Sequence, residues 1–149
     1  MPIAIKDSKI DITSEKLTKE LAKEFTNYLK GGEFVFLYGE MGVGKTTFVK
    51  YLINEYQKIN NLAQTEITSP TFSLLNEYQV KDIRIKHYDL FRIKRKEDID
   101  NLEIFEKDNK LITLIEWPQL LTDTQNIKSI DLTFNYLNDL NDRSVDIKV

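Results

Sequence analysis

The sequence predicts a three-layer α/β fold, in which helices flank a mixed central sheet that is parallel at its core and antiparallel at its edges. Two continuous apolar runs, at residues 34–38 and 111–115, are typical of parallel strands buried on both faces. Shorter strand-like runs lie at residues 2–6, 9–12, 72–78, 83–88, 130–136 and 143–149. We expect residues 79–82 and the Asn-Asp-rich segment after residue 136 to form hairpin turns between neighbouring strands.

Two helices are predicted, one before and one after the first apolar run. The first has apolar residues at every fourth position from Leu17 to Leu29, a capping hydroxyl at Thr13 or Ser14, and a Gly-Gly pair at residues 31–32 that ends it. The second starts near residue 45 and has apolar residues at helical spacing, namely Phe48, Val49, Leu52, Ile53 and Tyr56. A charged segment at residues 96–108 is more loosely helical.

The first apolar run leads directly into a phosphate-binding loop. Residues 39–46 match Gly-x-x-x-x-Gly-Lys-Thr, with the preceding strand and following helix that this pattern requires. Glycines let backbone N–H groups turn around phosphate oxygens, while the lysine binds the β and γ phosphates and the threonine hydroxyl binds Mg²⁺. A glycine-rich turn without a ligand is far less favoured. We expect a nucleotide to contact Gly39, Glu40, Met41, Gly42, Val43, Gly44, Lys45, Thr46 and Thr47.

A polar segment joins the second helix to the strand-like run at residues 72–78. It ends in Thr68-Ser-Pro-Thr71, where Pro70 keeps Ser69 out of helical conformation, so the segment is predicted to be extended. Hydroxyl-bearing loops at this place can close over the γ-phosphate and Mg²⁺. A switch formed by Ser69 and Thr71 and a solvated connector are equally compatible with these residues.

Acidic residues stand at the ends of two predicted strands. Glu116 follows the apolar run at residues 111–115, where the carboxyl end of a parallel strand faces the ligand of an open α/β sheet, so a role with Mg²⁺ or water is favoured over simple solvation. Asp89 ends the run at residues 83–88 and is either a metal-binding acid or a surface aspartate. His87 has a structural or a catalytic role, and packing is favoured over base stacking for Trp117.

Composition limits the other possibilities. The length of 149 residues predicts one domain, and the absence of cysteine excludes disulfides and thiolate metal sites. A net charge of −3 argues against a protein that grips nucleic acid by itself, and the basic run at residues 92–96 is better explained as a solvated helix start. No apolar run approaches the ~20 residues needed to span a bilayer. The cytoplasm is the default expectation.

Four segments together resemble the TsaE family, the small bacterial ATPases of tRNA threonylcarbamoyladenosine synthesis. The segments are the loop at residues 39–48, Ser-Pro-Thr-Phe at 69–72, His-Tyr-Asp-Leu-Phe-Arg at 87–92 and Ile-Glu-Trp-Pro at 115–118. Their order and spacing extend over nearly the whole chain. The phosphate loop is common to many NTPases, but the other three segments in one short chain are specific.

The resemblance implies a P-loop NTPase fold that binds ATP or ADP with Mg²⁺. It also implies partners, a TsaD-type transferase and a TsaB-type companion, with tRNA reached only through that complex and no membrane involved. ATP turnover would support repeated threonylcarbamoyl transfer to the adenosine beside the anticodon, which the family does not itself perform.

The resemblance also assigns roles to individual residues. Lys45 and the loop amides would hold phosphates, and Ser69 and Thr71 would form a switch-like loop. Asp89 would be the acid of a Walker-B-like segment, and Glu116 would bind the metal or a water, with Trp117 beside it. The expected metal ligands are therefore Thr46, Asp89 and Glu116, and the expected catalytic residues are Lys45, Thr71, Asp89 and Glu116. Glu40, Met41, Val43 and Gln119 depart mildly from the family pattern.

Two other NTPase classes share the phosphate loop. A small-molecule P-loop kinase needs an acceptor region and usually a lid that excludes water, and the strand-like C-terminal third leaves little chain for either. A regulatory GTPase would have Asp-x-x-Gly after the metal-binding acid, but Asp89 is followed by Leu-Phe-Arg. The guanine-binding pattern also fails, because Asn109-Lys110 is followed by Leu-Ile. The kinase remains the alternative prediction.

Overall fold

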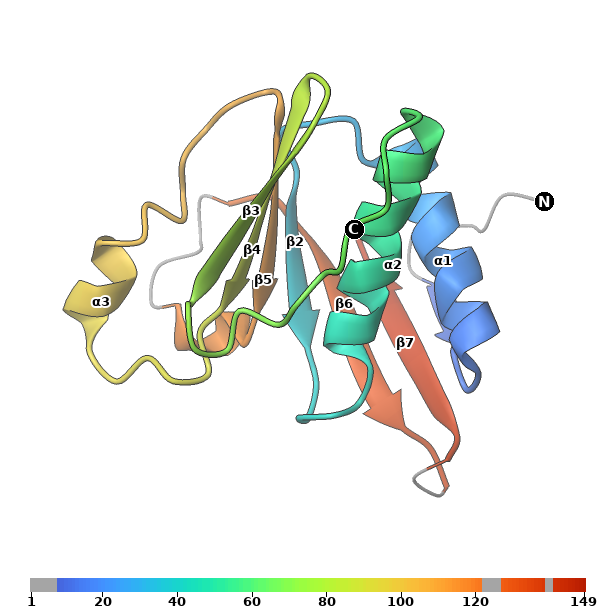
Figure 1. Ribbon diagram of the computed structural model, residues 1–149. Helices are drawn as coiled ribbons and strands as arrows, with labels where there is room; N and C mark the ends of the chain where they lie inside the picture. The colour runs from blue at the N-terminus through green and yellow to red at the C-terminus, as the bar shows by residue number, and fades with distance from the viewer. Residues whose placement is uncertain (1–7, 122–126, 139–140) are drawn as a thin grey trace.

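A computed structural model describes residues 8–121, 127–138 and 141–149 (Figure 1). These residues form a seven-stranded sheet in the order β1-β7-β6-β2-β5-β4-β3. The strands are β1 (Ser8–Asp11), β2 (Phe34–Tyr38), β3 (Leu75–Val80), β4 (Ile83–Asp89), β5 (Leu111–Glu116), β6 (Ser129–Tyr136) and β7 (Arg143–Lys148). The helices are α1 (Glu15–Tyr28), α2 (Lys45–Ile59), the short α3 (Lys96–Asp100) and the 3₁₀ helix η1 (Pro118–Leu120). None of these helices is long and apolar enough to cross a membrane.

The mixed sheet predicted from the sequence is confirmed. β2 is parallel to both β5 and β6, and β4 is parallel to β5, so the four central strands are parallel. The pairs β3–β4, β6–β7 and β1–β7 are antiparallel and complete the two edges. All six residues of β5 are buried, as its continuous apolar run predicts. The carboxyl ends of β2, β4 and β5 consequently meet at one edge of the sheet.

Helices α1 and α2 cover one face of the sheet (Figure 1). The Ser14 hydroxyl accepts a hydrogen bond from the backbone N–H of Leu17 and caps α1, which identifies the capping residue among the two predicted. The rings of Phe25 and Phe48 meet edge to face at 5.5 Å between centroids, and Phe48 also contacts Phe134 of β6. This core holds α2, and therefore the phosphate loop before it, against the sheet.

The opposite face has a smaller core around Tyr88 and Leu90, beneath α3 and the segment that follows it. The helix predicted loosely over residues 96–108 is shorter than expected and ends at Asp100. The residues after Asp100 are held by contacts with β4. The Tyr88 hydroxyl donates to the Leu102 carbonyl at 2.8 Å, and Lys86 and Arg84 of β4 bind Glu106.

The strand predicted at residues 72–78 is displaced. β3 runs over Leu75–Val80, and the residues before it form a turn in which the Leu74 N–H donates to the Pro70 carbonyl at 2.7 Å. Phe72 is consequently 81% exposed instead of lying in a strand. The hairpin turn is also shorter than predicted and comprises Lys81 and Asp82 alone. The strand predicted at residues 2–6 and part of the later hairpin turn lie outside the described residues.

Candidate functional site

The phosphate loop joins the end of β2 to the start of α2 at the centre of the sheet (Figure 1). Gly39 has a φ of 141°, and a Cβ at this position would lie 2.8 Å from the Phe134 carbonyl oxygen. Gly44 precedes α2 with a φ of 120° and brings no side-chain hydrogen bond to the helix start. Since the first N–H groups of a helix have no partner within it, the start of α2 offers free donors and positive potential to an anion.

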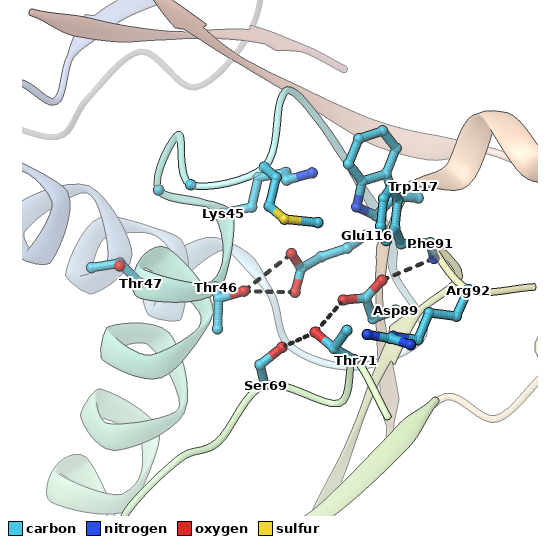
Figure 2. A pocket seen from close by; sticks show the side chains of 13 residues that line it. Lys45, Thr46, Thr47, Ser69, Thr71, Asp89, Phe91, Arg92, Glu116 and Trp117 are labelled. Atoms are coloured by element: carbon cyan, nitrogen blue, oxygen red, sulfur yellow. Dashed lines mark hydrogen bonds between the residues drawn. The ribbon is translucent and has the colours of Figure 1, made fainter. Parts of the chain in front are cut away.

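Lys45 lies almost completely buried at this helix start, with 3% of its surface exposed. Its ammonium donates to the Gly39 carbonyl at 2.6 Å and lies 4.0 Å from the centre of the Trp117 ring (Figure 2). Burial lowers the pKa of Lys45, while the carboxylates of Glu116 and Asp89 oppose that shift. The result is a poorly solvated cation close to the free N–H groups of α2.

Glu116 connects the end of β5 to the phosphate loop. It is 3% exposed, and the Thr46 hydroxyl lies 3.1 Å from each of its carboxylate oxygens (Figure 2). The His87 Nε2 lies 2.6 Å from the Glu116 Oε2. The sequence left a structural and a catalytic role open for His87. The structure shows that its ring contacts a carboxylate of the candidate site.

Asp89 lies beside Glu116 in the register of β4 and β5 but has different partners. The Thr71 hydroxyl donates to its Oδ2 at 3.0 Å, and the Phe91 N–H donates to its Oδ1 at 3.0 Å (Figure 2). The Ser69 and Thr71 hydroxyls are 2.7 Å apart. Both oxygens of Asp89 therefore accept hydrogen bonds from the protein, and the segment of residues 69–71 is tied to the end of β4.

A cavity of about 300 Å³ lies between these groups (Figure 2). It is lined by every residue of the predicted site except Gly39, Glu40 and Val43. The Val43 side chain is fully buried in the core, so this residue can reach a ligand only through its backbone. Thr47 lines the cavity, but its side chain points away from Glu116 (Figure 2).

The sequence prediction missed two residues that line the cavity, Phe91 and Arg92. The Phe91 ring packs at 4.8 Å from that of Trp117, and the Arg92 guanidinium lies 4.2 Å from the exposed Phe72 ring. Both residues follow Asp89 closely, so their position just after a candidate acid at a strand end was the signal that could have found them. They extend the site from the carboxylates to the protein surface.

Trp117 has a left-handed backbone, with a φ of 61° and a ψ of 47°. This conformation is uncommon for a residue with a Cβ and costs on the order of 1 kcal/mol. It places the indole between the Lys45 ammonium and the Phe91 ring. The packing role favoured for Trp117 is therefore combined with a position on the cavity wall.

The site offers few side-chain ligands for a metal, which suits Mg²⁺ better than a metal that needs all its ligands from the protein. In the described part of the chain, no group of three or more His, Cys, Asp and Glu residues could hold a metal ion. Mg²⁺ is usually bound by one or two side-chain oxygens, with waters and substrate phosphates completing its octahedron. Thr46 and Glu116 offer such oxygens beside a helix start that favours phosphate, so the residues fit a Mg²⁺–nucleotide complex.

Comparison with known proteins identifies the family. The family model for "Threonylcarbamoyl adenosine biosynthesis protein TsaE" matches residues 12–145. The chain belongs to the TsaE family. The protein named tRNA threonylcarbamoyladenosine biosynthesis protein TsaE from Rickettsia typhi is 41% identical over 110 residues, which are 74% of each chain. The TsaE protein of Rickettsia bellii is 36% identical over 133 residues, 89% of this chain and 90% of its own.

A solved structure shares the fold of this TsaE family member. The crystal structure of YdiB from Bacillus subtilis superposes with a TM-score of 0.67 and covers 95% of this chain and 84% of its own. Its sequence identity is 22%, so the likeness supports the fold alone. The family resemblance drawn from the four sequence segments and the predicted fold class are both confirmed.

Proposed function

We propose that this TsaE family protein binds ATP or ADP with Mg²⁺ and hydrolyses ATP. Its turnover would support repeated threonylcarbamoyl transfer, by a TsaD/TsaB-type complex, to the adenosine beside the anticodon of tRNAs. The observation that carries the proposal is the contact of the Thr46 hydroxyl with Glu116 beside the buried Lys45 at the start of α2. A cation that would bind phosphate, a hydroxyl that would bind the metal and a carboxylate are thereby grouped at one helix N-terminus.

The residues divide the work by their positions. The Lys45 ammonium and the first N–H groups of α2 would hold the phosphates, because the ammonium is a buried cation and the N–H groups form the positive end of the helix. The Thr46 hydroxyl can donate its hydrogen to Glu116 and keep its lone pairs for the metal. Bound Mg²⁺ would neutralise charge that develops on the phosphate oxygens during transfer. Trp117 and Phe91 form an apolar wall that limits water around Lys45.

Glu116 is the better candidate for direct action on the metal or on the attacking water. Both oxygens of Asp89 accept hydrogen bonds from Thr71 and the Phe91 backbone, so Asp89 is placed to hold the segment of residues 69–71. This arrangement supports a role for that segment as a switch whose position depends on Asp89. Glu116, in contrast, contacts the phosphate-loop hydroxyl itself.

The proposed partners rest on the resemblance of the four sequence segments to the TsaE family, and no surface in the described part of this chain identifies them. The names of the relatives state a role in tRNA threonylcarbamoyladenosine biosynthesis. A net charge of −3 does not favour direct binding of tRNA, so we propose that tRNA is reached only through the TsaD-type transferase and the TsaB-type companion.

The test is ATP hydrolysis by the purified chain, first alone and then with its cognate TsaD- and TsaB-type partners, with and without tRNA. We expect weak hydrolysis by the chain alone and an increase with the partners. Phosphorylation of a small-molecule acceptor, with no effect of the partners, would overturn the proposal in favour of a P-loop kinase. Lys45→Ala serves as the inactive control, and Lys50→Ala is its match at an exposed position of α2.

A further inference from the structure

A chain of hydrogen bonds leads from the phosphate loop to the interior of the sheet. The Thr46 hydroxyl of α2 contacts Glu116 of β5, and the Glu116 Oε2 lies 2.6 Å from the His87 Nε2 of β4. Three elements that are far apart in the sequence are joined at one carboxylate. Within the described residues, Thr46 and His87 are the hydrogen-bond partners of this buried carboxylate.

The surroundings of His87 determine where its ring hydrogen lies. The residue is fully buried, and its Nδ1 has no hydrogen-bond partner among the described residues. A hydrogen on Nδ1 would be a buried donor without an acceptor, which is unfavourable because the donor loses its bond to water and gains none in the protein. It would also turn the lone pair of Nε2 toward the Glu116 carboxylate. A ring with its hydrogen on Nε2 donates to Glu116 and leaves only an acceptor nitrogen, Nδ1, facing the core.

We propose that His87, donating from Nε2, is a positioning residue that holds the Glu116 carboxylate against the Thr46 hydroxyl. His87 does not line the cavity, so it would act on the nucleotide only through Glu116. The inference rests on the proposed Mg²⁺–nucleotide function of the site.

Without this bond the Glu116 carboxylate keeps one donor, and its side chain has rotational freedom across the cavity. Partners that orient a metal-binding group typically change metal affinity or activity by about 10- to 100-fold when they are removed. A histidine that merely fills space would have no such effect, because an apolar side chain of similar volume would replace it. Loss of the His87 bond should therefore reduce the part of nucleotide affinity that depends on Mg²⁺ and leave the part that comes from phosphate contacts.

The position of the ring hydrogen can be measured without nucleotide. His87 is the only histidine of the chain, so ¹⁵N labelling of histidine gives one imidazole spectrum. We expect a ring with its hydrogen on Nε2, and a slowly exchanging Nε2 hydrogen whose signal changes in Glu116→Gln. A ring protonated at Nδ1, or a signal that Glu116→Gln leaves unaltered, would overturn the proposal.

The functional test compares His87→Leu, which removes the donor, with His87→Gln, which keeps an amide donor. ADP affinity is measured by calorimetry with and without Mg²⁺, and the melting temperature reports folding. We expect His87→Leu to lose about 10- to 100-fold of the Mg²⁺-dependent gain in affinity and to keep Mg²⁺-free ADP affinity within about twofold. His87→Gln should recover part of the loss. Thr113→Val, which replaces a buried polar residue on the neighbouring strand β5, is the matched control.

The outcomes separate this inference from the proposed function. An equal loss of affinity with and without Mg²⁺ in His87→Leu, or an unchanged Mg²⁺ dependence in a folded variant, would overturn the positioning role. If His87→Leu fails to fold, His87→Gln and the tautomer measurement still decide. If the unaltered protein shows no Mg²⁺-dependent nucleotide binding, the proposed function fails and the role of His87 toward the metal fails with it. The ring-hydrogen measurement then tests the contact with Glu116 by itself.

Discussion

Replacing Lys45 should remove most nucleotide affinity, whereas replacing Glu116 should spare the affinity measured without Mg²⁺. The Lys45 ammonium is 3% exposed and hydrogen-bonds the Gly39 carbonyl, so phosphate oxygens would meet a cation that is already desolvated. A hydrogen bond to a charged group is worth about 1.5–3 kcal/mol, which corresponds to roughly 10- to 150-fold in affinity. Lys45→Ala is therefore expected to weaken ADP binding by that factor. Glu116→Ala should change Mg²⁺-free binding much less and should reduce hydrolysis strongly.

Calorimetric titration is the suitable assay, because Lys45 contacts Trp117 and its replacement would alter tryptophan fluorescence directly. Lys45→Met keeps much of the apolar stem and separates loss of charge from loss of packing. Glu116→Gln keeps the shape of the side chain and tests whether the carboxylate charge is needed. Melting temperatures measured in parallel identify any variant that is unfolded.

Two results would refute this division of labour. An equal loss of Mg²⁺-free ADP affinity in Lys45→Ala and Glu116→Ala would show that the two residues do not have separate roles. Full affinity in both Lys45→Ala and Lys45→Met would show that phosphates do not bind at the start of α2.

Three further substitutions test the structure around the site. Gly39→Ala should lower the melting temperature and nucleotide affinity, because its Cβ would lie 2.8 Å from the Phe134 carbonyl oxygen at a φ of 141°; unchanged values would contradict the loop geometry. Phe25→Ala should reduce the free energy of unfolding by about 3–5 kcal/mol in denaturant titration, since the ring is fully buried, and a loss below about 1 kcal/mol would contradict that burial. The hydrogen bond from Lys86 lowers the pKa of Glu106, so its stabilising effect should be present above the ordinary value of 4.5 and be lost as pH falls through the lower folded value. The stability difference between the unaltered protein and Glu106→Gln should therefore disappear in that acidic range, and a difference independent of pH would exclude the ion pair as its cause.

Local patterns predicted most of the secondary structure. The apolar runs at residues 34–38 and 111–115 became β2 and β5, and the periodic apolar residues after Leu17 became α1. These predictions succeed because the spacing of apolar residues directly indicates whether a strand is buried on both faces or a helix on one stripe. The phosphate loop was equally clear, since its glycines and lysine have their function at fixed separations.

The errors occurred where contacts between distant residues override local pattern. Residues 72–74 looked like the start of a strand, but the turn closed by Leu74 and Pro70 delays β3 until Leu75, which pairs with Tyr88. Residues after Asp100 looked loosely helical, but Lys86 of β4 binds Glu106 and holds that segment in another conformation. Phe91 and Arg92 were missed as cavity residues although both lie in the 87–92 segment, because spacing along the chain does not show which way the residues after Asp89 turn.

The sequence by itself determined the phosphate loop, the acids at the ends of two strands and the family. It left open which acid contacts the Thr46 hydroxyl and which group His87 contacts. The tertiary structure answers both questions, because the strand order places β5 directly beside β2 and β4 one strand further away. Glu116 of β5 thereby contacts the Thr46 hydroxyl, and His87 of β4 contacts Glu116. Asp89 contacts Thr71 instead. Strand order depends on packing across the whole sheet, and residue spacing within any one segment does not encode it.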